Sequence, residues 1–179
     1  MEFKDVVLQR RSIRQFKEEP VDFNLIEQAI SLAKFYPSWK HTSIARFTYV
    51  SNADVLKKIA DEGSSFPLNM NTLAHSPAVI VVSYVTKRSG YERDGTFSSP
   101  KGDQWEMFDA GIATHNLSLA LHSVGLGSVI LGLFNEDRIA ELINLPENEK
   151  IATVLCVGYP AAIPEAPKRK ENSEILRRI

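Results

Sequence analysis

Residues 78–85, AVIVVSYV, form an almost unbroken run of apolar, mostly β-branched residues. A strand with one face in water alternates apolar and polar residues, whereas a strand covered on both faces is continuously apolar. The segments 125–134 and 151–159 are also near-continuously apolar and are bounded by or contain glycine. We therefore expect a central sheet with helices packed on both of its faces.

Helical periodicity accounts for most of the remaining chain. Residues 22–36 place apolar side chains on one face, with Asp22 as N-cap. Residues 104–125 are apolar on nearly all sides, which predicts a helix buried in this chain or in a dimer interface. We further predict helices at 3–10, 53–63 and 135–146 and a strand at 46–51, with loops or irregular structure at 37–45, 64–72 and 87–103.

The last twenty residues have a different composition. Pro160, Pro164 and Pro167 predict an extended arm, followed by KRK and a weak helical segment. Because the arm has no apolar core of its own, we expect it to pack on something else, such as another subunit. The chain is accordingly divided into a domain, residues 1–159, and an arm, residues 160–179.

Charge and composition exclude several classes of protein. The formal net charge of −1 gives no overall basic excess, so we expect no nucleic-acid partner. No apolar run approaches the length that spans a bilayer, and the N-terminal residues lack the pattern of a signal peptide. The single cysteine, Cys156, fits a reducing compartment and an inert core position. We expect a cytoplasmic protein without a membrane partner.

No metal site is predicted, because the histidines are scattered. His115 and His122 lie seven residues apart on one helix, and no close pair of cysteine or carboxylate ligands accompanies them. Asp109 and Asn116, on the same helix, are expected to pin neighbouring backbone and not to catalyse.

The motif RRSIR, residues 10–14, suits an anion. Guanidinium groups match phosphate oxygens bidentately, and Ser12 adds a hydroxyl donor. A solvated basic patch is the alternative interpretation. A second basic run, PKRK at 167–170, leaves the choice open because its distance from RRSIR is unknown.

Two further segments are candidates for binding. PSWKHTS, residues 37–43, mixes donors with an aromatic ring, which suits a flat heterocycle or a plain surface loop. GLGSVILG, residues 125–132, lies after a helix and before a strand, the reverse of a dinucleotide fingerprint. Gly132 ends an apolar strand, where bare backbone can approach a ligand closely.

Several motifs together resemble the FMN-dependent nitroreductase family. They are RRSIRQFKEEPV, YPSWKHTSIARFTYVS, SPAVIVVSY, WEMFDAGIATHNLSLALHSVGLGSVILGLFN, LPENEK, VGYP and PKRK, in family order. The resemblance runs from Arg10 to about Arg169, nearly the whole chain. It implies an α+β fold, a three-layer α/β/α sandwich around a mixed central sheet. It also implies an intertwined homodimer with two FMN molecules at the subunit interface.

The resemblance also implies roles for individual residues. The FMN phosphate would be held from both basic runs, by Arg10, Arg11, Ser12, Arg14, Lys168 and Arg169. The isoalloxazine and ribityl would lie along one loop, formed by Pro37, Ser38, Trp39, Lys40 and His41. The ring would also meet the backbone of Leu131 and Gly132 and, at its pyrimidine end, Asn71 or Asn69.

The chain departs from the family pattern in one loop. Where the family often has Asn, Gln and Pro-Trp, this chain has His41, Ser43 and Ile44-Ala45. These departures bear on the redox tuning of the flavin and on the substrate. We assign no catalytic residue, although the imidazole of His41 is a candidate proton donor or polarising group.

The implied reaction is ping-pong. NADH or NADPH would deliver hydride to the flavin, and a small-molecule acceptor such as a nitroaromatic, quinone or enone would then take the electrons. Two alternatives stay open. One is a flavin enzyme of other chemistry, a dehalogenase or a flavin-consuming enzyme. The other is a non-catalytic module that binds an anionic nucleotide or a protein partner.

Overall fold

The computed structural model describes residues 1–179 and contains one four-stranded sheet with the strand order β1-β2-β4-β3. The strands are β1 (Ala45–Val50), β2 (Ala78–Val85), β3 (Gly127–Leu131) and β4 (Glu149–Gly158). The α-helices are α1 (Phe3–Gln9), α2 (Phe23–Ala33), α3 (Ala53–Glu62), α4 (Pro67–Ala74), α5 (Gln104–Ser123), α6 (Glu136–Leu142) and α7 (Asn172–Ile175). A short 3-10 turn spans Trp39–His41.

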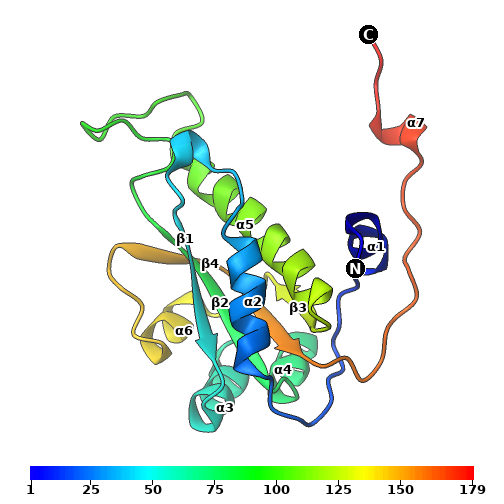
Figure 1. Cartoon of the computed structure of the whole chain (residues 1–179). Coiled ribbons are helices and arrows are strands. Elements are labelled where there is room, and N and C mark those ends of the chain that lie inside the picture. The colour runs from blue at the N-terminus through cyan, green and yellow to red at the C-terminus, as the bar shows by residue number, and fades with distance from the viewer.

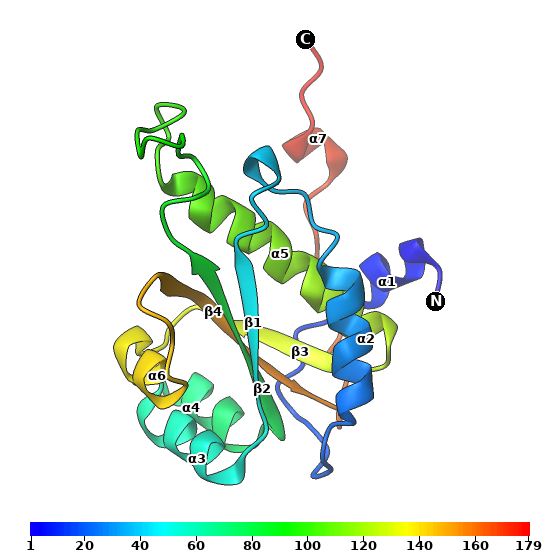
Figure 2. The same cartoon turned by 60° about the vertical axis from the view of Figure 1, so that its left-hand side comes forward.

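The sheet lies between two layers of helices (Figures 1 and 2). On one face, α2 and α5 pack against Ile80, Val82 and Leu155. On the other face, α3, α4 and α6 pack against Val79, Val81 and other inward side chains. Because successive side chains of a strand point to opposite faces, β2 supplies both cores and must be apolar throughout. The expected α+β class and the three-layer α/β/α sandwich are confirmed.

The four strands pair antiparallel throughout. β1 and β2 illustrate the reason: α3 and α4 lie at the end of the sheet where β1 stops, so the chain re-enters from that end and runs back. Parallel pairing is limited to one bridge, between Ser12 and Ser128 beside β3. The mixed character expected for the sheet is therefore confined to that bridge.

Most element boundaries agree with the sequence-based expectations, but α6 ends at Leu142, four residues before the expected end, and two other helices differ as well. Helix α4 begins at Pro67, inside the segment 64–72 that we expected to be irregular, and it continues to Ala74. Pro67 occupies the first turn of this helix. Proline favours that position because the backbone N–H groups of a first turn have no acceptor within the helix, so nothing is lost by lacking one. Helix α2 ends at Ala33, three residues before the expected end.

The segment containing RRSIR is fixed between β3 and the end of β4. The Ile13 N–H donates to the Ser128 carbonyl at 2.9 Å, and the Lys17 N–H donates to the Tyr159 carbonyl at 2.9 Å. A side chain at Gly127 would collide with Ile13, whose Cγ1 lies 2.7 Å from an added Cβ. These contacts anchor the basic segment to the sheet.

The C-terminal arm leaves the body of the domain after its first residues (Figures 1 and 2). The Ala161 N–H donates to the Gln15 carbonyl at 2.9 Å, and every residue from 161 to 179 is exposed. Separately, no helix of the structure combines the length and the apolar character that crossing a bilayer requires.

Cys156 lies on β4 in the core shared with α3 and α6, and its side chain is fully buried. Burial raises the pKa of its thiol to about 12. The thiolate is the reactive form, and at pH 9 only about one thiol in a thousand would be ionised.

We therefore expect the native protein to resist a disulfide reagent such as 5,5′-dithiobis(2-nitrobenzoate) at pH 9. The same chain in concentrated urea should release one equivalent of the coloured product at once, which serves as the control. Rapid labelling of the native protein would contradict the buried position of Cys156.

Candidate functional site

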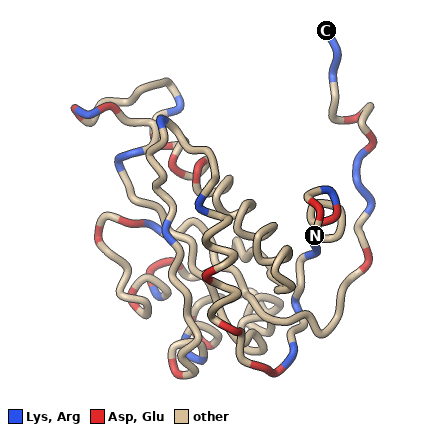
Figure 3. The backbone as a smooth tube through the Cα atoms, viewed as in Figure 1, with Lys and Arg blue, Asp and Glu red and all other residues tan.

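The two basic runs of the sequence meet near α1. The pKa of Arg10 is lowered first by burial and then by the positive charges of Arg169 and Arg11. Arg169 belongs to the arm, which passes beside α1 in the fold (Figure 3). Cations brought together in this way repel one another unless an anion lies between them. The structure therefore resolves the question of distance that the sequence left open.

A cavity of about 290 Å³ lies beside this cluster, between the N-terminal segment and the start of the arm. Its lining includes Arg11, Gly127, Ile163 and His122 from the last turn of α5. The pKa of His122 is lowered by burial and then by the charges of Arg10 and Arg11. Its buried Nε2 atom has no hydrogen-bond partner. The cavity thus combines positive charge with an unused polar atom.

The members of RRSIR are placed differently. Arg11 donates through Nη1 to the carbonyls of Leu8 and Arg10, at 2.7 and 2.9 Å, so it braces the backbone. Ser12 pairs with Ser128 through the backbone and is half-buried, while Arg14 is exposed. Arg10 and Arg14 are the guanidinium groups with no hydrogen bond to the protein in this segment.

The loop 37–43 lies at the opposite end of α5. The Trp39 N–H donates to Asp109 Oδ2 at 2.9 Å, and the Trp39 ring packs on Trp105 with a centroid distance of 4.4 Å. The Ser89 hydroxyl donates to the same Asp109 oxygen at 2.5 Å. One buried carboxylate therefore holds this loop and the excursion 87–103 together. The expectation that Asp109 pins backbone is confirmed.

Asn116, about two turns after Asp109 on α5, also binds a neighbouring backbone segment. Its Nδ2 donates to the Ala33 carbonyl at 2.9 Å, where α2 ends and the chain turns toward Pro37. Because the last carbonyls of a helix lack intrahelical partners, this bond completes the C-terminus of α2.

The backbone of the loop is strained. Lys40, His41 and Ser43 have φ of 43, 56 and 46°, in the left-handed region that costs energy for residues other than glycine. The Ser43 N–H donates to Ser38 Oγ at 2.9 Å, which closes the loop on itself. Strain of this kind persists where the surroundings hold it, and it is concentrated at binding sites.

Unpartnered buried polar atoms mark the same two regions. They are Trp39 Nε1, Thr42 Oγ1 and His122 Nε2. Since a buried polar group without a partner costs about 1–3 kcal/mol, natural proteins keep few of them. Two lie in the loop 37–43 and the third lies in the cavity beside Arg11. The loop is a segment expected to contact the ring of FMN, and the cavity lies beside the motif RRSIR, which is expected to contact its phosphate.

A third group of candidate residues lies where β3 ends. Leu131 is buried and its carbonyl accepts from Thr153 Oγ1 at 2.9 Å, whereas Gly132 is exposed with open space where a Cβ would stand. A cavity of about 380 Å³ adjoins Gly132. Four residue steps along β3, about 13 Å, separate Ser128 from Gly132. That span suits a ligand with an anion at one end and a ring at the other.

Of the two candidate asparagines, Asn69 lies at this end of β3. Its Nδ2 donates to the Leu133 carbonyl at 2.9 Å, and the Ser64 hydroxyl donates to the same oxygen at 2.7 Å. Asn71 is exposed on α4, and its carbonyl contacts His75 Nδ1 at 2.8 Å. The structure therefore places Asn69 beside Gly132 and leaves Asn71 apart from it.

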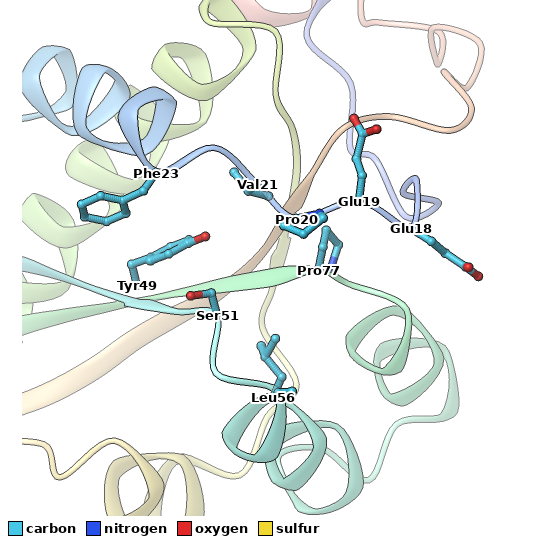
Figure 4. A pocket seen from close by; sticks show the side chains of 10 residues that line it. Glu18, Glu19, Pro20, Val21, Phe23, Tyr49, Ser51, Leu56 and Pro77 are labelled. Atoms are coloured by element: carbon cyan, nitrogen blue, oxygen red, sulfur yellow. The ribbon is translucent and has the colours of Figure 1, made fainter.

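A further cavity, of about 640 Å³, contains none of the candidate residues. Figure 4 shows it between Phe23 and Tyr49 on one side and Leu56 and Pro77 on the other. Glu18 and Glu19 stand at its edge, and their carboxylates point away from it. Negative charge at this edge disfavours a phosphate. Elsewhere in the chain, no three His, Cys, Asp or Glu side chains gather as a metal ion would require.

Sequence reasoning missed His122 and Ser89. His122 was considered only as a metal ligand, although its place in the last helical turn before GLG puts it next to the strand that RRSIR joins. Ser89 carried no signal in the sequence, because its bond to Asp109 depends on the path of the excursion 87–103.

Comparison with known proteins gives matches over most of the chain. The Nitroreductase family matches residues 7–65 and 64–159. The chain is 31% identical to "Putative NADH dehydrogenase/NAD(P)H nitroreductase" of Archaeoglobus fulgidus, over 87% of this chain and 83% of that protein. It is 27% identical to "Putative NAD(P)H nitroreductase YfhC" of Bacillus subtilis, over 93% and 88%. It is 28% identical to the iodotyrosine deiodinase of Daphnia pulex, over 98% of this chain and 65% of that protein.

Solved structures share the fold. A nitroreductase family protein from Clostridium novyi has a TM-score of 0.75 at 26% identity, covering 89% of this chain and 86% of that one. A nitroreductase from Desulfovibrio desulfuricans, solved in complex with FMN, has a TM-score of 0.76 at 20% identity, covering 98% and 96%.

The Asp109 bonds give a stability prediction. Replacing Asp109 with Ala leaves the Trp39 N–H and the Ser89 hydroxyl without their acceptor, at about 1–3 kcal/mol for each group that stays buried. We expect a lower urea midpoint for unfolding and altered fluorescence from Trp39 and Trp105. Asp103→Ala is the matched control, since Asp103 precedes the same helix, is exposed and caps nothing. Equal effects of the two variants would refute the role of Asp109.

Proposed function

Because this chain belongs to the Nitroreductase family, we propose that it is an FMN-dependent oxidoreductase that uses NADH or NADPH to reduce a nitroaromatic, quinone or similar acceptor. The observation that carries the cofactor assignment is the position of the three unpartnered buried polar atoms. Two of them lie in the loop 37–43, and the third belongs to His122, which lines the cavity beside Arg11 of the motif expected to bind the phosphate. A bound flavin nucleotide would offer these atoms acceptors or donors.

The phosphate end of the proposed site is formed by residues of one chain. Arg10 and Arg14 would supply unengaged guanidinium groups and Ser12 a hydroxyl, and Arg169 and Lys168 would contribute from the arm. Guanidinium–phosphate pairs are charge-assisted and bidentate, so they are strong. Burial first, and then the charges of Arg169 and Arg11, lower the pKa of Arg10, and a phosphate here would offset both effects.

The ring end follows from the length of β3. With the phosphate beside Ser12 and Ser128, the isoalloxazine would lie at Gly132, where the bare backbone permits close approach. Asn69 is within reach of the same edge through its position at Leu133. Backbone groups and one amide at this end would orient the ring.

One chain does not enclose this ligand. Asp109, which holds the loop 37–43, and His122, beside the phosphate cluster, are thirteen residues apart on α5, or about 20 Å. We propose that the loop of one chain completes the site of a second chain in a homodimer. Apolar side chains exposed on α1 and α5 are available for the interface: Phe3, Val7, Leu8, Met107 and Phe108. The exposed arm, residues 160–179, would pack on the partner.

Bound FMN would supply reversible hydride transfer, first from the nicotinamide and then to the acceptor. The protein's contribution is to bind the phosphate, to orient the ring and to exclude water. The packed rings of Trp39, in the loop 37–43, and Trp105, on α5, would form an apolar wall of the site. His41 is exposed at its edge, where it could exchange a proton with solvent. We assign no other side chain to acid or base chemistry.

FMN binding is the first test. The purified protein, mixed with FMN and then desalted, should keep flavin absorption bands near one flavin per chain. Arg10→Ala with Arg14→Ala should weaken FMN binding about tenfold or more, since each loses a charge-assisted hydrogen bond. Lys58→Ala, which removes an exposed charge on α3, is the control. A chain that retains no flavin would favour a non-catalytic binding module.

The dimer gives a separate prediction. Phe108→Glu places a charge on an exposed apolar position of α5, beside the ring of Trp105. We expect it to dissociate the dimer and to weaken FMN binding, although no cofactor contact is changed. Sedimentation should show twice the chain mass of 20.1 kDa for the unchanged protein and one chain for the variant. Flavin retained by a single-chain species would contradict the shared site.

A reductive dehalogenase is the second candidate, because the chain is 28% identical to the Daphnia pulex iodotyrosine deiodinase. Product analysis separates the two. Released halide under reducing conditions would indicate dehalogenation, whereas a hydroxylamine or amine from a nitroaromatic would indicate nitroreduction.

A further inference from the structure

A second polar cavity, of about 530 Å³, opens between the loop 37–43 and the excursion 87–103. Its lining is strongly cationic. It contains four permanent cations, one carboxylate and a histidine: Lys40, Lys87, Arg88, Arg93, Glu92 and His41. The formal net charge of the whole chain is −1, so this concentration of positive charge is local.

Most of these cations are free to bind a ligand. Glu92 is engaged by Lys40, with Nζ and Oε1 2.5 Å apart, and Lys87, Arg88 and Arg93 take part in no ion pair. The Asp94 carboxylate accepts hydrogen bonds from Thr96. Glu106 is buried and its Oε1 meets the backbone N–H of Arg88 at 3.4 Å, so it does not pair with the guanidinium.

The lining is also strained and incompletely hydrogen-bonded. Five residues other than glycine have positive φ, and Lys40, His41 and Lys87 are three of them. Thr42, which lines the cavity, has a buried hydroxyl without a partner. Strain and an unused polar group are features that natural sites retain where a ligand compensates for them.

The cavity is attached to the proposed flavin site. Asp109 accepts hydrogen bonds from both Trp39 and Ser89, so it links the loop 37–43 to the cationic excursion. Aromatic side chains lie alongside the cations: Tyr91 and Phe97 pack together with a centroid distance of 4.9 Å. A molecule stacked on the flavin would therefore extend toward aromatic rings and guanidinium groups.

We propose that this cavity binds an oxyanion carried by the substrate that stacks on the flavin. The inference rests on the proposed function, and it adds that the substrates are anionic. Two sources share this chemistry, a carboxylate on an aromatic acceptor and the phosphates of the nicotinamide reductant. Arg88 and Arg93 are the specificity-determining residues, because guanidinium groups bind oxyanions bidentately.

The experiment compares charged probes with neutral probes that keep the same reacting group. For the acceptor, the probes are 4-nitrobenzoate and the neutral 4-nitrobenzamide. For the reductant, they are NADH and the uncharged 1-benzyl-1,4-dihydronicotinamide. The measured quantity is the ratio of kcat/KM for the charged probe to kcat/KM for the neutral one, in the FMN-loaded protein. Calorimetric titration of 4-nitrobenzoate and 4-nitrobenzamide gives a second readout without turnover.

We expect Arg88→Gln and Arg93→Gln each to lower one of these ratios about five- to tenfold, as the loss of a charged hydrogen bond implies. Lys58→Gln removes a distant exposed charge and should leave both ratios unchanged. A fall in the acceptor ratio identifies the carboxylate as the anion, and a fall in the reductant ratio identifies the phosphates. Added salt should lower the same ratio in the unchanged protein.

Ratios that stay constant in both arginine variants would overturn the proposal. This includes the case in which kcat/KM falls equally for the charged and the neutral probe, which would indicate a structural role for the arginine. Failure of the proposed function is recognised separately, as a protein that retains no FMN and oxidises no NADH. In that case the calorimetry still decides: equal affinity for 4-nitrobenzoate and 4-nitrobenzamide would refute the anion site by itself.

Discussion

The packing of α5 against the sheet sets the distance between two parts of the candidate site, the loop 37–43 and the cavity beside the basic cluster. Its buried face, with Ala113, Leu117 and Leu121 fully enclosed, joins the core formed by β2, β4 and α2. Its first turns carry Asp109, which holds the loop 37–43, and its last turn carries His122, beside the basic cluster. The two halves of the proposed site are therefore held apart by one rigid element, and pairing of two chains is the economical way to join them.

Much of the fold could be predicted from the sequence, because burial on both faces leaves a plain pattern in strands such as 78–85. Helix α4 could not, since its apolar residues have no clear period and Pro67 is read as a break unless its position in the first turn is known. The C-terminal arm was correctly expected to lack a core, but the sequence gives no path for it. Its path is what brings Arg169 near Arg10.

The candidate site was predicted in parts. RRSIR and PKRK each allowed a solvated patch or a phosphate site, and only their proximity in the structure favours the phosphate. Asn69 and Asn71 were indistinguishable by sequence, because the choice depends on which face of α4 meets Leu133. The cationic cavity was not predicted, since residues 87–103 have no periodic pattern and their charges gather only after the excursion folds back over the loop 37–43.

The fixed geometry of α5 also limits how the chain can change in length. One residue inserted between Asp109 and His122 would rotate the following positions by about 100° and shift them by about 1.5 Å. The helix could then not keep the bond from Trp39 to Asp109, the position of His122 in the cavity beside Arg11 and the buried face all at once. Insertions and deletions are therefore expected to accumulate in the excursion 87–103 and in the arm. The spacing of residues along α5 should stay constant as relatives diverge.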